Sequence, residues 1–196
     1  MQFRIWVEQS EKQESQPLIA LDNTSVPWET WKDWTDPIEF FAYGDMIASE
    51  KRPTADFHTA RARGMIRVFD VPAANGREGL LSIRKTGRLE DVVNGLIFTV
   101  PGEDVQEMGS KYPGYHLGTV TVILTDAENG LPMRKKKTVF YLFNPKRLQR
   151  KLQPNAQHLR QLLQNAYQIS PQFGDEFVRT TFRLPKRGSR LVRITR

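Results

Sequence analysis

Two strand-like segments on either side of an Asn-Gly turn are the strongest constraint on how this chain can fold. Residues 118–125 (GTVTVILT) and 133–143 (MRKKKTVFYLF) are rich in β-branched and aromatic side chains, and Asn129-Gly130 lies between them. This arrangement predicts an antiparallel β-hairpin with a long connection. The apolar part lies away from the turn and a cationic run lies near it, so we expect an arm with a basic tip.

Further strands are predicted from alternation and apolar runs. They cover 2–8, 65–71, 80–85 and the second half of 91–100, where Pro101-Gly102 ends the run. At the C-terminus, alternation over 178–184 and 190–196 around the turn-forming stretch 185–189 predicts a second hairpin.

Helices are predicted where capping residues precede apolar residues at helical spacing. Short helices are expected near 28–34 and over about 36–48, with Asp36 as N-cap and Pro37 in the first turn. Another is expected to begin at Asn144-Pro145. The principal one covers about 156–168, where Asn155 can cap and leucines form one stripe.

Together these elements predict an α+β fold with a mainly antiparallel sheet or small barrel, one principal C-terminal helix and two hairpins. A ferredoxin-like or RRM-like arrangement and a small barrel with an appended helix both satisfy this description. The length of 196 residues favours a single domain, 1–196. Within it we distinguish an irregular, aromatic-rich acidic segment, 9–60, and a basic part, 134–196.

Charge is strongly segregated along the chain. Residues 1–60 contain 5 Lys/Arg and 11 Asp/Glu, whereas residues 134–196 contain 16 Lys/Arg and only 2 Asp/Glu. A basic surface attracts nucleic acid because each phosphate that it neutralises releases condensed counterions. The pattern therefore predicts a phosphate-binding surface in the last third of the chain.

The leading functional hypothesis is a non-enzymatic nucleic-acid-binding subunit of a larger complex, with RNA favoured over DNA and single-stranded DNA as the other candidate. Its cations would cradle the phosphate backbone, and Tyr141 would stack on a base because its hydroxyl tolerates exposure. The predicted binding residues are Arg134, Lys135, Lys136, Lys137, Tyr141, Lys146, Arg147, Arg150, Lys151, Arg179, Arg183, Lys186, Arg187, Arg190 and Arg193.

Two alternatives remain open from the sequence. The first is a structural subunit of a virus or phage particle or another large assembly, with aromatic residues of segment 26–43 contacting other protein subunits. The second is a metal-independent ribonuclease that uses His58, which lies beside Arg61, or His116, which lies beside Tyr115.

Several chemistries have no support in the sequence. Without cysteine, the chain cannot form a disulfide, a thiolate zinc site or an iron–sulfur cluster. Phosphate-binding glycine motifs and His-x-x-x-His spacing are also missing, so no metal or cofactor is predicted. The N-terminal residues have no apolar signal region and no apolar run is long enough to span a membrane, which predicts a cytoplasmic, unprocessed protein without membrane contact.

Overall fold

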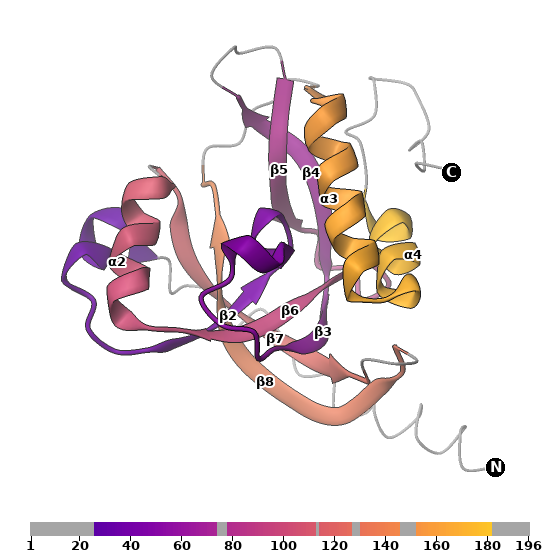
Figure 1. Cartoon of the computed structure of the whole chain (residues 1–196), viewed down its shortest axis with the longest axis horizontal. Helices are drawn as coiled ribbons and strands as arrows, with labels where there is room; N and C mark the ends of the chain where they lie inside the picture. The colour runs from indigo at the N-terminus through magenta and orange to yellow at the C-terminus, as the bar shows by residue number, and fades with distance from the viewer. Residues whose placement is uncertain (1–25, 74–77, 113, 127–129, 146–151, 182–196) are drawn as a thin grey trace.

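The computed structural model describes residues 26–73, 78–112, 114–126, 130–145 and 152–181. Five strands form a closed barrel in the order β7-β3-β6-β2-β8, with β8 pairing back onto β7 (Figure 1). These strands are β2 (Ile38–Ala42), β3 (His58–Arg63), β6 (Val92–Val100), β7 (His116–Thr125) and β8 (Pro132–Phe143). Within the barrel only the β2–β8 pair is parallel. The short strand β1 (Val26–Pro27) extends the sheet beside β7.

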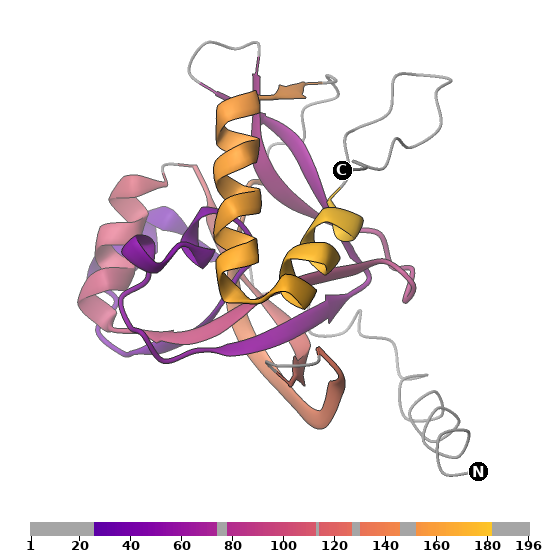
Figure 2. The same ribbon diagram turned by 45° about the vertical axis from the view of Figure 1, so that its right-hand side comes forward.

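A second sheet stands beside the barrel. It contains β4 (Met65–Pro72), β5 (Glu78–Lys85) and the short β9 (Gln153–Pro154). Helices α3 (Ala156–Ile169) and α4 (Pro171–Thr180) pack together next to it, as Figure 2 shows. Helix α2 (Gly102–Lys111) packs against the 3-10 helix η2 (Trp28–Asp33). Two further 3-10 turns, η3 (Asp45–Ile47) and η4 (Ser49–Lys51), follow β2.

The predicted fold class is confirmed: the chain is α+β, with a mostly antiparallel sheet closed into a small barrel and a helical C-terminal part. The hairpin that most constrained the prediction is β7–β8, whose register pairs Val120 with Val139. The principal helix is α3, and the Asn155 side chain accepts a hydrogen bond from the His158 backbone N–H at its start, 2.9 Å away. Among the described residues no helix has the length and apolarity to cross a membrane.

The helix predicted over 36–48 is wrong in its first half. Phe40, Phe41 and Ala42 belong to β2, which pairs with β6 on one side and β8 on the other. Both faces of this strand are buried, so its apolar residues are consecutive and do not alternate. A short continuous apolar run has the same appearance in a buried strand and in a buried helix, which explains the error.

In two other places the structure has a helix that was not predicted from the sequence. Pro101-Gly102 does end β6, but the same residues open helix α2, which the sequence reading missed. Val178 and Thr180 lie in α4 and not in a strand, because Phe173 and Phe177 are buried at helical spacing. The rest of the predicted C-terminal hairpin, the strand over 2–8 and most of the helix after Pro145 lie outside the described residues.

Gly95 on β6 marks the tightest approach inside the barrel. A Cβ atom there would lie 2.4 Å from the Ala42 carbonyl oxygen and 2.6 Å from a ring carbon of Phe41. We expect Gly95→Ala to lower the free energy of unfolding by about 1–3 kcal/mol, because overpacking forces the backbone of β2 to shift. Chemical denaturation measures this. Thr99→Ala, at an exposed position on the same strand, is the control. Equal stability of the two variants would contradict the predicted close contact.

Candidate functional site

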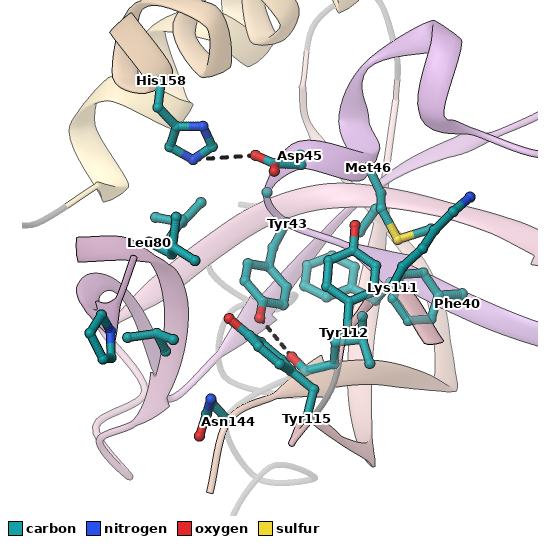
Figure 3. A pocket seen from close by; sticks show the side chains of 17 residues that line it. Phe40, Tyr43, Asp45, Met46, Leu80, Lys111, Tyr112, Tyr115, Asn144 and His158 are labelled. Carbon is teal, nitrogen blue, oxygen red and sulfur yellow. Dashed lines mark hydrogen bonds and ion pairs between the residues drawn. The ribbon is translucent and has the colours of Figure 1, made fainter. Parts of the chain in front are cut away.

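A pocket of about 490 Å³ lies beside the C-terminal end of β2, and Figure 3 shows its lining. One side is formed by Tyr43, Gly44, Asp45 and Met46, which follow β2 directly. The β4–β5 hairpin, the α2–β7 connection, the end of β8 and the start of α3 complete the wall. This volume falls within the range of small-molecule sites.

Asp45 and His158 form the charged corner of the pocket. The Asp45 Oδ1 atom lies 3.4 Å from His158 Nε2, and Asp45 Oδ2 lies 3.5 Å from Lys51 Nζ. Asp45 comes from η3, whereas His158 comes from the first turn of α3, so the two elements converge here. Asn155, which caps α3, also donates to the Glu78 carboxylate at 2.9 Å and so ties this helix to β5. Among the described lining residues, Asp45 is the only carboxylate.

Three tyrosines lie across the pocket from this corner. The Tyr43 hydroxyl donates to the Leu142 carbonyl oxygen at 2.6 Å. Figure 3 shows the hydroxyl of Tyr115 pointing towards that of Tyr43. Within the described part of the chain, the hydroxyls of Tyr112 and Tyr115 make no hydrogen bond. Two phenol groups are therefore available to a bound molecule.

Burial keeps these phenols protonated. Burial, followed by the charge of Asp70, raises the pKa of Tyr115 to about 12, and burial raises the pKa values of Tyr43 and Tyr112. Burial also raises the pKa of Tyr141 to about 12. At neutral pH each tyrosine is a hydrogen-bond donor and not a base.

These shifts predict loss of stability in alkali. A folded-state pKa above the unfolded value near 10 adds stability that is complete below pH 10 and disappears as pH rises through about 12. We expect Tyr115 and Tyr141 to contribute about 2–3 kcal/mol each at most, and tyrosinate absorbance to rise together with loss of far-ultraviolet circular dichroism. Full ionisation near pH 10 with the fold retained would contradict the prediction.

A buried arginine fixes the turn that carries Asp45. The Arg67 side chain on β4 is fully buried, and its Nε atom donates to the Tyr43 carbonyl oxygen at 2.9 Å. The same guanidinium donates to the Asn94 side chain and carbonyl and to the Thr180 hydroxyl. It lies 3.8 Å from the centre of the Phe177 ring. The turn after β2 is thereby linked to β6 and α4.

The predicted nucleic-acid residues that the structure describes do not line this pocket. Arg134, Lys135 and Lys136 are exposed on β8 towards its hairpin tip, and Lys137 forms an ion pair with Glu39. Arg179 lies in the last turn of α4. Tyr141 is 3% exposed, so its ring cannot stack on a base. The remaining predicted residues, Lys146, Arg147, Arg150, Lys151, Arg183, Lys186, Arg187, Arg190 and Arg193, lie outside the described residues.

Most of the described aromatic residues of segment 26–43, which was predicted to contact other subunits, are buried in this chain's own core. Trp31, Phe40 and Phe41 are at most 1% exposed and belong to the core. His58 is exposed at the start of β3 and His116 starts β7, and neither lines the pocket. No group of His, Asp and Glu side chains among the described residues has a metal-binding arrangement.

Comparison with solved structures identifies proteins of similar fold. A gamma-glutamyl cyclotransferase structure aligns with 72% of this chain and 86% of its own, with a TM-score of 0.58 and 16% identity. An uncharacterized human protein gives a TM-score of 0.56, 17% identity and the same coverages. The yeast gamma-glutamyl cyclotransferase specific to glutathione gives a TM-score of 0.50 at 13% identity, covering 74% of this chain and 96% of its own. The fold resembles that of gamma-glutamyl cyclotransferase. No family model and no curated protein matches the sequence.

This resemblance contradicts the hypothesis of a non-enzymatic nucleic-acid-binding subunit, and with it the ribonucleoprotein, virion and assembly-partner interpretations. Net charge along a sequence does not reveal whether side chains enclose a cavity, and here the described lining combines residues of the acidic, middle and basic parts of the chain. The overlooked signal was the sequence FFAYGD, in which a buried apolar run ends at a turn with Asp45.

Proposed function

We propose that this protein is an enzyme acting on a small γ-glutamyl compound, which it converts by intramolecular cyclisation. The observation that carries the proposal is the pocket itself. It sets the Asp45–His158 corner opposite two tyrosine hydroxyls that have no hydrogen-bond partner among the described residues, in a fold similar to gamma-glutamyl cyclotransferase. A small-molecule pocket with a few polar groups in an apolar wall is the usual form of an active site.

The charged corner suits the amino-acid end of a γ-glutamyl group. The Asp45 carboxylate can accept hydrogen bonds from the α-ammonium, and the neighbouring His158 ring can donate to the α-carboxylate. Because both side chains come from elements anchored to the rest of the fold, the zwitterion would be held in one orientation. Holding the nucleophile near its target removes much of the entropic barrier to cyclisation.

The proposed reaction needs no water and no redox partner. The α-ammonium gives a proton to Asp45, and the resulting amine forms a bond to the γ-carbonyl carbon. The bond from that carbon to the departing nitrogen then breaks as Asp45 returns its proton to that nitrogen. The attacking nitrogen gives up a second proton when it becomes the lactam N–H, and the released amine takes up this proton through Asp45. The products are 5-oxoproline and the amine in its ammonium form.

The tyrosines supply stabilisation of the developing negative charge. As the amine attacks, the γ-carbonyl oxygen becomes an oxyanion, which preorganised donors stabilise. Tyr115 and Tyr112 are protonated donors facing the pocket, so either hydroxyl can serve this oxygen. We further propose that the enzyme acts in the cytoplasm, where γ-glutamyl compounds would reach it as free metabolites.

Release of 5-oxoproline from a panel of γ-glutamyl amides, detected by mass spectrometry, tests the proposal. Release that depends on the purified protein is the expected result. Binding without release would make the pocket a non-catalytic ligand site. The absence of both binding and release would overturn the proposal.

A further inference from the structure

The first part of β8 leaves the regular ladder of the barrel through an irregular pairing with β7. Ile123 pairs with Lys136 and Thr125 pairs with Pro132, so a single residue of β7 lies opposite three residues of β8. Extra residues on one strand form a bulge, which bends that strand and disrupts the ladder locally. As a result four consecutive residues, 133–136, are exposed, whereas a strand packed flat on a core would alternate.

Segment 131–136, which contains this bulge, combines exposed apolar and cationic side chains. Leu131 is 59% exposed and Met133 is 48% exposed, more than any other large hydrophobic residue of the described chain. Three exposed cations follow directly, namely Arg134, Lys135 and Lys136. The segment contains no carboxylate. A partner that covers the two apolar side chains would remove hydrocarbon from water, and the cations favour a partner that is anionic.

A lipid surface fits this combination better than a nucleic acid does. Anionic headgroups attract lysine and arginine at a membrane surface, and the boundary between headgroups and acyl chains takes up apolar side chains. Single-stranded nucleic acid is bound through aromatic rings as well as cations, and segment 131–136 contains no aromatic residue. The sequence predicts no membrane contact because it lacks a long apolar run, but binding at the surface needs none.

The position of the segment leaves the pocket accessible. Leu142, which lines the pocket, lies near the opposite end of the same strand. Figure 1 and Figure 2 both show the curved first part of β8 at the lower edge of the described chain, whereas the β4–β5 hairpin, which contributes a pocket wall, rises above the barrel. A flat surface that binds at this lower edge therefore does not cover the pocket.

We propose that segment 131–136 is a peripheral membrane-binding site, through which the protein docks on a bilayer that contains anionic lipid. Leu131 and Met133 insert at the headgroup boundary, and the three cations contact the anionic headgroups. Two apolar side chains and three cations give reversible binding, because stable anchoring takes larger signals. This docking goes beyond the proposed function and does not depend on the chemistry in the pocket.

Flotation of the full-length protein with lipid vesicles tests the docking. Vesicles of phosphatidylcholine and phosphatidylserine mixed at about two to one are compared with vesicles of phosphatidylcholine alone. Partition onto the mixed vesicles should be at least about ten-fold higher, and it should fall as the salt concentration is raised. Equal partition onto both kinds of vesicle, or partition onto neither, would overturn the proposal.

A pair of double variants tests whether the cations of this segment are responsible. Lys135→Gln/Lys136→Gln should weaken partition onto the mixed vesicles at least about ten-fold. Arg160→Gln/Arg179→Gln removes the same charge from exposed positions on α3 and α4, and should weaken partition less than about three-fold. Equal losses in the two variants would indicate a general attraction of a basic protein and would contradict a site on β8.

The apolar pair distinguishes lipid from other polyanions. Leu131→Gln/Met133→Gln keeps every charge, yet it should weaken partition onto the mixed vesicles at least about ten-fold. Leu89→Gln is the control, because Leu89 is 45% exposed and lies outside the segment. Undiminished partition of the double variant, or binding of a single-stranded RNA oligonucleotide that is tighter than binding of the vesicles, would overturn lipid docking.

Two further measurements keep these results interpretable. Circular dichroism shows that each variant is folded. Release of 5-oxoproline without vesicles should be unchanged in the β8 variants, because segment 131–136 does not line the pocket. Loss of docking with release retained would sink the membrane site alone, and docking without release would sink the proposed function alone.

Discussion

Asp45→Asn is expected to lower kcat/KM for release of 5-oxoproline at least about 100-fold, the usual scale for loss of a general base. The amide keeps the size of the carboxylate but cannot accept the proton of the α-ammonium. The contact with His158 is also changed, because the side-chain charge that faces the imidazole is lost. Initial rates of the purified variant, with its circular dichroism compared with the wild type, provide the measurement.

Asp36→Asn is the control for this substitution. Asp36 is exposed, precedes β2 and lies outside the pocket lining, so its change should leave the rate within about two-fold. A wild-type rate in a folded Asp45→Asn variant would eliminate Asp45 as the base. His158→Gln provides a second test, because loss of the partner for the α-carboxylate should raise KM more than it lowers kcat.

Arg67→Ala is expected to lower the free energy of unfolding by at least about 3 kcal/mol. The substitution leaves the Tyr43 carbonyl and the Asn94 carbonyl with fewer donors in the interior and opens a cavity against Phe177. Buried acceptors without donors cost about 1–3 kcal/mol each, so the sum exceeds a typical surface change. Urea or guanidinium denaturation monitored by tryptophan fluorescence measures the effect.

Two comparisons separate the network from the mere loss of an arginine. Arg134→Ala removes an exposed arginine on β8 and should change stability by less than about 0.5 kcal/mol. Arg67→Met restores much of the lost volume but not the hydrogen bonds, so it should recover part of the stability and little of the catalytic rate. Wild-type stability in Arg67→Ala would show that the network does not hold the turn after β2.

Burial also affects the charge state of this arginine. Burial lowers the pKa of Arg67 to about 9, with Glu176 acting in the opposite direction. Because a pKa of about 9 still lies above neutral pH, the buried guanidinium keeps its positive charge at the pH of most assays. Its charge is offset by the Phe177 ring face and the surrounding oxygen acceptors, and not by a direct ion pair among the described contacts.

The sequence predicted well where local chemistry decides the structure. The β7–β8 hairpin follows from two β-branched strands around a glycine turn, and α3 follows from the Asn155 cap and its leucine stripe. The sequence predicted poorly where tertiary burial decides. The apolar run Phe40–Ala42 became a strand because partners on both sides satisfy its backbone, and a single sequence does not show such partners.

The candidate site was missed for the same reason. Asp45, Tyr115 and His158 are separated by 70 and 43 positions in the sequence, and no motif spacing links them. They meet because barrel closure places the end of β2 beside the α2–β7 connection, while β5 holds the start of α3. Cations, by contrast, are conspicuous in a sequence whether or not they converge, so charge counting favoured a phosphate surface.

The α+β class with a mainly antiparallel sheet, the central hairpin, the principal helix and its cap could be predicted from local sequence, because they depend on residues within a few positions of each other. The five-stranded closure, the buried Arg67 network and the pocket are evident only in the folded chain. Each of these features needs contacts between segments that are far apart in the sequence. Those contacts are stabilised by removing apolar surface from water when the whole chain packs.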